Sequence, residues 1–101
     1  MRNAMVLITV TYHLKPGCRE AFVKAVLEEK ISEQTRMEEG NLEYRFSLPL
    51  DSLDEVCLLE KWDSRACLAP HGAQPHYLRL QELKALYVEK TSVKRFETTA
   101  L

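Results

Sequence analysis

The chain has 101 residues and a mass of 11.7 kDa, so residues 1–101 are expected to form one domain around a single hydrophobic core. Its 14 basic and 15 acidic side chains give a formal net charge of -1, which argues against a nucleic-acid-binding surface, because such surfaces carry clustered basic residues. The 3 glycines lie far apart, which excludes the glycine-rich turns that hold nucleotide cofactors. No apolar stretch approaches the ~18 residues of a membrane-spanning helix, so we expect no membrane partner.

The number and spacing of the cysteines indicate the redox state of the compartment in which the protein works. Cys18, Cys57 and Cys67 are odd in number and irregularly spaced, which argues against a disulfide framework and favours a reducing environment. The apolar run at residues 5–8 is too short for the hydrophobic region of a signal peptide. We therefore expect a cytoplasmic protein.

The first half of the chain predicts a strand, a long helix and a second strand. Residues 5–14 are rich in β-branched side chains, which is typical of a central strand. Residues 17–39 carry the longest helical pattern, and we expect one helix there that ends at Gly40. Residues 41–48 alternate between apolar and polar side chains, which indicates a half-buried strand.

The second half continues with a strand, two helices and a last strand. Residues 55–62 complete a hairpin with residues 41–48. Asp63 or Ser64 is a good N-cap for a short helix through Ala69, which Pro70 and Gly72 break, and Pro75 opens the next helix. Residues 88–98 are predicted to form the last strand. Their apolar side chains do not all fall on alternate positions of one face, which predicts a bulge or twist.

The resulting order β-α-β-β-α-β predicts an α+β, ferredoxin-like fold: a four-stranded antiparallel sheet with helices on one face. The other face has no remaining element to cover it. The strand at residues 55–62 is nevertheless apolar on both faces, with Cys57 and Leu59 opposite Val56 and Leu58. An uncovered apolar sheet face predicts a protein partner, and a second copy of the chain is the simplest one. We expect a homodimer.

The densest group of chemically active side chains runs from Glu60-Lys61-Trp62 through His71 to Pro75-His76-Tyr77. This spacing resembles the antibiotic biosynthesis monooxygenase domain family, as do Lys15-Pro16-Gly17 and Glu39-Gly40-Asn41. The resemblance implies a dimeric α+β barrel with a pocket between sheet and helices. In some members, the deprotonated substrate passes an electron to dioxygen, and quinols or polyketide rings are oxygenated without metal or flavin.

The two histidines are the candidate catalytic residues. A histidine can accept the proton of a phenol or enol near neutral pH, so His71 or His76 would be the base. The structural alternatives are a cap on the short helix for His71 and a plain hydrogen bond for His76. Trp62, the single tryptophan, would stack on an aromatic substrate as a pocket wall, or would instead be a core side chain.

Three further side chains complete the predicted site. Tyr77 and Tyr44 are expected to line the pocket or the core. Glu60 shares a strand face with apolar side chains, so it is either a pocket acid or the partner of a basic residue such as Arg45 or Lys94. Cys67, His71 and His76 could be read as metal ligands, but Pro70 interrupts their helix turn and a fourth ligand is missing. We expect neither a metal nor another cofactor.

Three functions remain open from the sequence. The first is a cofactor-independent monooxygenase acting on a small aromatic or quinol-type substrate. The second is an isomerase or degrading enzyme for a small signalling metabolite, and the third is a non-catalytic dimeric module that binds a metabolite. Leu58 stands where polyketide-oxidising members carry asparagine, which places the polyketide substrate in doubt. Arg79 is the arginine that we expect close to the histidines, so a phosphorylated substrate is less favoured than an apolar one.

Overall fold

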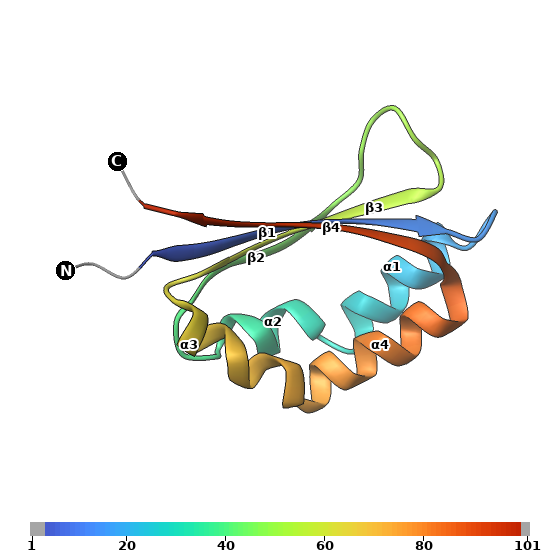
Figure 1. Cartoon of the computed structure of the whole chain (residues 1–101). Helices are drawn as coiled ribbons and strands as arrows, with labels where there is room; N and C mark the ends of the chain where they lie inside the picture. The colour runs from blue at the N-terminus through green and yellow to red at the C-terminus, as the bar shows by residue number, and fades with distance from the viewer. Residues whose placement is uncertain (1–3, 100–101) are drawn as a thin grey trace.

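The computed structural model describes residues 4–99 and has the predicted order of strands and helices (Figure 1). The sheet has the order β2-β3-β1-β4, and all of its paired strands are antiparallel. This is the ferredoxin-like arrangement. The elements are β1 Met5–Leu14, α1 Arg19–Glu28, α2 Ile31–Arg36, β2 Asn41–Ser47, β3 Glu55–Trp62, α3 Arg65–Leu68, η1 Ala69–Ala73, α4 Pro75–Tyr87 and β4 Val88–Thr98.

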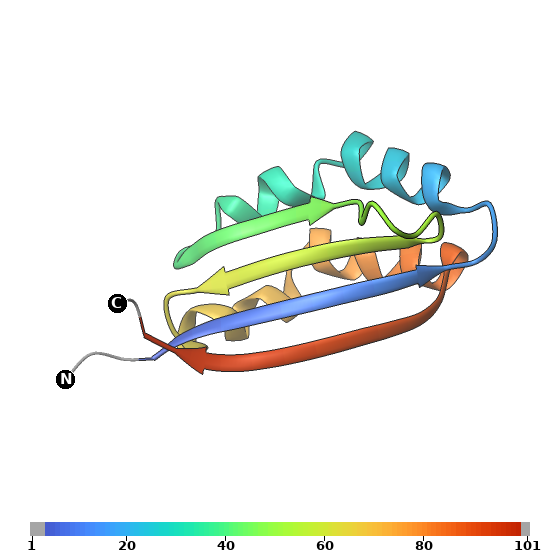
Figure 2. The ribbon, with the colours of Figure 1, turned by 90° about the horizontal axis from the view of Figure 1, so that it is seen from above.

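All helices lie on one face of the sheet, so the molecule has two layers (Figures 1 and 2). The strand pattern explains this layering, because alternate side chains of β1 and β3 are buried and the intervening ones are only half-buried. The core between the layers is built from the inward side chains of β1 and β3 and from Phe22, Val26, Ile31, Leu80 and Leu83 of the helices. No helix in residues 4–99 is long and apolar enough to cross a membrane.

The outer face of the sheet is left uncovered by the part of the chain that the structure describes (Figure 1). Half-buried Leu7, Thr9, Cys57 and Leu59 lie on this face at the centre of the sheet, on β1 and β3. Phe96, opposite Leu7 on the edge strand β4, is 49% exposed. The sheet therefore has one apolar face inside the molecule and a second, mixed face open to a partner.

The long helix predicted for residues 17–39 is wrong, because the chain breaks it into α1 and α2. Lys30 takes a left-handed conformation (φ 53°) between them. In one continuous helix, Ile31 would point roughly 140° away from Val26, since each residue turns the helix by about 100°. The break turns α2 so that Ile31 packs into the core together with Val26. Gln34 stabilises the break by donating from its side-chain amide to the carbonyls of Glu29 and Lys30.

The short helix after β3 begins as predicted, and its α-helical part ends at Leu68, one residue before the predicted end at Ala69. The side chain of Ser64 caps α3 by accepting from the backbone N–H of Cys67 at 3.2 Å. The chain then continues into the 3₁₀-helix η1, in which Pro70 is tolerated because it stands at the start, where no N–H is needed. This continuation carries His71 back over the sheet, where it is buried.

The bulge predicted in the last strand is confirmed by a shift in the pairing of β1 and β4. His13 pairs with Lys90, whereas Leu14 pairs with Val88. After the shift, Thr91, Val93 and Arg95 lie opposite the inward side chains of β1 and so face the helices. The bulge therefore decides which side chains of β4 reach the interior.

Gly40 is expected to be the most sensitive glycine of the chain. It has a positive φ of 80°, and a Cβ at this position would collide with the side chain of Cys67. Gly17 has a similar φ of 77° but has no atom within 4 Å of such a Cβ. We expect Gly17→Ala to cost about 1–2 kcal/mol of backbone strain, and Gly40→Ala to cost a further ~1–3 kcal/mol of overpacking. Urea unfolding of both variants checks this, and equal losses would contradict the steric argument.

Candidate active site

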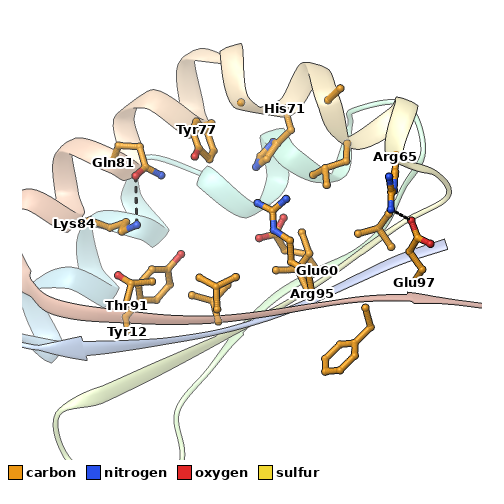
Figure 3. Close-up of a pocket in the computed structure, with 18 residues that line it drawn as sticks. Tyr12, Glu60, Arg65, His71, Tyr77, Gln81, Lys84, Thr91, Arg95 and Glu97 are labelled. Carbon is orange, nitrogen blue, oxygen red and sulfur yellow. Dashed lines mark hydrogen bonds and ion pairs between the residues drawn. The ribbon is translucent and has the colours of Figure 1, made fainter. Parts of the chain in front are cut away.

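A cavity of about 640 Å³ lies between the sheet and the layer formed by α3, η1 and α4 (Figure 3). Its floor comes from β1, β3 and β4, and its roof from the helices. Glu60, His71 and Tyr77 line it, as the sequence predicted. The cavity opens towards the edge strand β4, where Val93 is 50% exposed. The volume suits a small molecule of one or two rings.

Two histidines share one carboxylate oxygen behind this cavity. His71 donates from Nδ1 to Glu38 Oε2 at 2.6 Å, and His76 donates from Nε2 to the same oxygen at 2.7 Å. An ionised carboxylate only accepts hydrogen bonds, so these contacts fix the tautomers of both imidazoles. The other nitrogen of His71, Nε2, is left without a partner in residues 4–99, and His71 is the one of the two histidines that lines the cavity.

Backbone contacts hold Glu38 in place. It lies in the turn between α2 and β2, where its N–H donates to the Thr35 carbonyl at 3.0 Å and its carbonyl accepts from Asn41 at 3.2 Å. Two residues further on, the Gly40 carbonyl accepts from the N–H of Asp63 at 2.8 Å. The turn that carries the carboxylate is thus fastened to the segment that leads into α3 and His71.

An aromatic shell fixes the ring of His71. The ring centroids of Trp62 and Tyr77 each lie 5.1 Å from that of the imidazole, and Tyr44 lies at 5.9 Å. His71 is only 4% exposed. Packing on several sides together with the bond to Glu38 leaves the imidazole one orientation, which is what a catalytic base requires.

The family of this chain follows from comparisons with known proteins. The family model described as "Antibiotic biosynthesis monooxygenase" matches residues 5–83, which include Glu38, His71 and His76. The chain belongs to this family. A search of curated proteins finds no match.

Solved structures agree with this assignment at the level of the fold. A protein from Shewanella oneidensis is 20% identical, with 96% of this chain and 93% of the other covered and a TM-score of 0.85. A protein from Mycobacterium tuberculosis is 24% identical, with coverage of 96% and 97% and a TM-score of 0.82. A structure described as an antibiotic biosynthesis monooxygenase is 22% identical, with coverage of 94% and 99% and a TM-score of 0.80.

Three of the site residues predicted from the sequence of this monooxygenase-family protein do not line the cavity. Trp62 and Tyr44 are buried in the core and do not line it, so the contact of either side chain with a substrate stays a prediction, and this geometry favours the core alternative. His76 is also absent from the lining and contacts the site through Glu38. The period of two does place Trp62 on the cavity side of β3, but α3 and η1 close over it.

Glu60 lies on the cavity floor, and its carboxyl accepts from Trp62 Nε1 at 3.1 Å. Burial raises the pKa of Glu60, although the Trp62 hydrogen bond and the charges of His71 and Arg95 oppose the shift. The alternative of an ion pair with Arg45 or Lys94 is wrong, because these residues pair with outward-facing positions of β3 and β1 and occupy the other face of the sheet.

Glu60→Gln is expected to change how stability depends on pH. A folded-state pKa above the ordinary 4.5 means that the folded protein holds the proton more tightly than the unfolded chain. The free energy of unfolding of the wild type therefore falls as the pH rises above 4.5, and the variant lacks this part of the fall. Its amide oxygen still accepts from Trp62. Urea titrations from pH 4 to 8 measure the difference, with the exposed Glu39→Gln as control; a constant difference across that range would contradict the burial argument.

The sequence did not predict that Glu38 and several basic side chains lie at the cavity. The segment Glu39-Gly40-Asn41 begins directly after Glu38, and Glu38 itself has the sequence context of a helix surface. Arg65, Lys84 and Arg95 all line the cavity, whereas Arg79 pairs with Glu29 and Glu82 instead. The helical spacing of Lys84 from Tyr77, seven residues apart in α4, was the available signal.

Of the three residues that could be read as metal ligands in the sequence, the structure brings His71 and His76 together with Glu38 instead of Cys67. Within residues 4–99, the ligand atoms of Glu38, His71 and His76 lie within 4.8 Å of one another, and Cys67 does not join them. Two imidazoles and a carboxylate suit zinc or iron(II). The present distances of 2.6 and 2.7 Å are those of hydrogen bonds. In this arrangement the three side chains form one hydrogen-bonded network centred on Glu38 Oε2.

Proposed function

We propose that this chain is a cofactor-independent monooxygenase that oxidises a small aromatic or quinol-type substrate, with His71 as the general base. The observation that carries the proposal is that the two ring nitrogens of His71 have different surroundings. Nδ1 is bound to Glu38, while the ring lines the cavity and has its second nitrogen available to a ligand. This is the arrangement of an oriented base, in which a carboxylate holds the tautomer and stabilises the imidazolium that forms.

The chemistry needs only the substrate, dioxygen and a base. His71 Nε2 takes the proton of a ring hydroxyl, and the resulting anion passes one electron to dioxygen. The two radicals combine at a ring carbon to form a peroxide. His71 then returns its proton to the peroxide, the same ring carbon loses its hydrogen as a proton, and the O–O bond breaks. One oxygen atom stays on the substrate as a carbonyl, and the other leaves with the two protons as water. A hydroquinone and dioxygen thus give a hydroxyquinone and water, and the four electrons that reduce dioxygen all come from the substrate.

The surroundings of His71 support this chemistry. The carboxylate of Glu38 favours the positive charge that the imidazole gains on taking the proton. The apolar floor contributed by Val6, Ile8 and Val10 suits an aromatic ring and limits water around the anion.

Oxygen consumption tests the proposal. An oxygen electrode would follow the purified protein with a panel of substituted hydroquinones, each corrected for its spontaneous oxidation. We expect enzyme-dependent uptake of one dioxygen per substrate and a hydroxylated product by mass spectrometry. Chemical conversion of a metabolite without oxygen uptake would favour the isomerase alternative, and tight binding without any turnover would favour the non-catalytic module.

The proposed enzyme works as a homodimer in the cytoplasm. Its three cysteines are free thiols, which fits a reducing compartment. The uncovered outer face of the sheet supplies the surface for a second copy, and a stable interface should bury at least ~1,200 Å².

Sedimentation equilibrium is expected to give twice the mass of the chain at micromolar concentration. Leu59→Lys places a charge at the centre of the outer face and should give the monomer mass, because an unpaired buried charge is costly. Leu78→Lys is the matched control, since Leu78 is 51% exposed on α4, away from the sheet. A monomer mass for the wild type, or no effect of Leu59→Lys, would contradict the assembly.

A further inference from the structure

The cavity has a second polar end that the proposed base does not use. Figure 3 shows Tyr12, Gln81, Lys84 and Thr91 together at the end away from His71. Lys84 Nζ lies 5.7 Å from the centre of the Tyr12 ring and donates to Gln81 Oε1 at 3.4 Å. We call these four residues the Lys84 end.

The cations that face the cavity differ in whether an acid neutralises them. Arg65, at the rim, is paired with Glu97. Neither Lys84 nor Arg95 has an acidic side chain within ion-pair distance among residues 4–99. The lining thus contains three basic side chains and two acidic ones, Glu60 and Glu97. The cavity therefore carries an excess of positive charge in a chain whose formal net charge is -1.

Burial makes the isolated ammonium of Lys84 costly. Desolvation lowers the pKa of Lys84, which means that the surroundings of this side chain disfavour its charge. A half-buried cation that points into a cavity without an acidic partner is a site at which an anionic ligand gains more than it would from a surface lysine.

The pairing of the strands shows that the two cations lie over different positions along β1. Arg95 lies opposite Ile8 on β1, and Lys84 lies over Tyr12, four residues further along the same strand. Four residues of a strand span about 13 Å. Val10 and its neighbour Val93 form the floor between them. Figure 3 shows the guanidinium of Arg95 pointing from the sheet towards His71. A cation thus stands at each end of a short apolar floor.

The geometry points to a small aromatic carboxylic acid as the ligand of this cavity: its carboxylate binds the Lys84 end, its ring lies on Val10 and Val93, and its hydroxyl meets His71 beside Arg95. This inference rests on the proposed function for the role of His71. Arg95 then stabilises the oxyanion that forms when His71 removes the hydroxyl proton, so it acts on charge that develops during the reaction.

The Lys84 end fits a carboxylate better than a phosphate ester. It offers one ammonium group, the amide of Gln81 and the hydroxyls of Tyr12 and Thr91. Phosphate sites ordinarily use helix N-termini or several basic side chains. Lys84 instead lies in the last turn of α4, where the helix dipole is negative and opposes a dianion. A single negative charge is the better match.

Calorimetric titration under nitrogen, which measures binding without turnover, tests the inference with a matched pair of probes. The probes are 4-hydroxycinnamate and its neutral amide. We expect the acid to bind the wild type at least about tenfold more tightly than the amide, because hydrogen bonds to a charged partner are the stronger ones. Phenyl phosphate is the third probe, and we expect it to bind more weakly than the acid.

The variant Lys84→Met keeps an apolar stem over Tyr12 and removes the charge. It should lose the preference for the acid while keeping its affinity for the amide, and Lys24→Met on the exposed side of α1 should leave both unchanged. The thermal stability of Lys84→Met should not fall, because the substitution removes a desolvated charge. A loss of binding can therefore be separated from misfolding.

Equal binding of acid and amide by the wild type, an unchanged preference in Lys84→Met, or tighter binding of phenyl phosphate would overturn the inference. These outcomes are separate from those of the proposed oxygenase. A protein that prefers the acid but consumes no oxygen keeps the ligand class and loses the reaction. A protein that oxidises neutral hydroquinones but does not prefer acids keeps the proposed reaction and loses the proposed ligand class.

Discussion

Replacing His71 with asparagine should lower kcat by about 10²–10⁴-fold and leave the fold intact. The amide nitrogen of asparagine takes nearly the position of imidazole Nδ1, so the hydrogen bond to Glu38 can persist. The variant has nothing in the place of Nε2, the nitrogen that would accept the substrate proton. The rate of oxygen uptake at saturating hydroquinone measures the loss, and thermal unfolding checks the fold.

His76→Gln is the matched control for this variant. The amide nitrogen of glutamine reaches about as far as imidazole Nε2, so this variant also keeps its bond to Glu38. Because His76 does not line the cavity, kcat should change by only a few fold. Equal large losses in the two variants would assign the activity to the hydrogen-bond network as a whole. Unchanged kcat in His71→Asn would remove His71 as the base.

Trp62→Ala should cost about 3–5 kcal/mol of the free energy of unfolding, which is the usual loss for a large aromatic side chain in a core. The indole has no exposed surface, and its N–H satisfies the buried carboxyl of Glu60 at 3.1 Å. Alanine leaves a cavity beside His71 and removes the donor. For a domain of this size, each kcal/mol lowers Tm by about 4–8 °C, so calorimetry detects the change easily.

Trp62→Phe separates packing from hydrogen bonding at the same position. Phenylalanine fills most of the volume but donates nothing to Glu60, so it should lose clearly less than alanine. If Trp62→Ala melts within a few degrees of the wild type, the indole is not the core side chain described above, and its place would have to be a substrate contact.

The sheet was predictable from the sequence because its signals are local. β-branched side chains at residues 5–14 and alternating side chains at residues 41–48 predicted strands, and the irregular spacing of apolar side chains after Val88 predicted the bulge. The break at Lys30 was not predictable in the same way. The residues on both sides of Lys30 favour a helix. Only the packing of Val26 and Ile31 into the same core decides between one helix and two.

The site was predictable only in part, for a related reason. His71, Tyr77 and Glu60 stand out as unusual residue types within a motif, and they do line the cavity. Glu38 is one acid among 15, and only tertiary structure brings it against two histidines that lie 33 and 38 residues further along the chain. Arg95 is a similar case, because a charged residue on an edge strand ordinarily faces solvent.

The shared oxygen of Glu38 ties the activity to the completeness of the fold. Glu38 follows the first two helices, whereas His71 and His76 belong to the last ones, so the base is oriented only after both halves of the chain have docked on the sheet. A partly opened molecule that keeps its sheet and its cavity would still lose the fixed tautomer of His71. Turnover would thus stop at local opening, before global unfolding, and inactivation on heating should precede the loss of secondary structure.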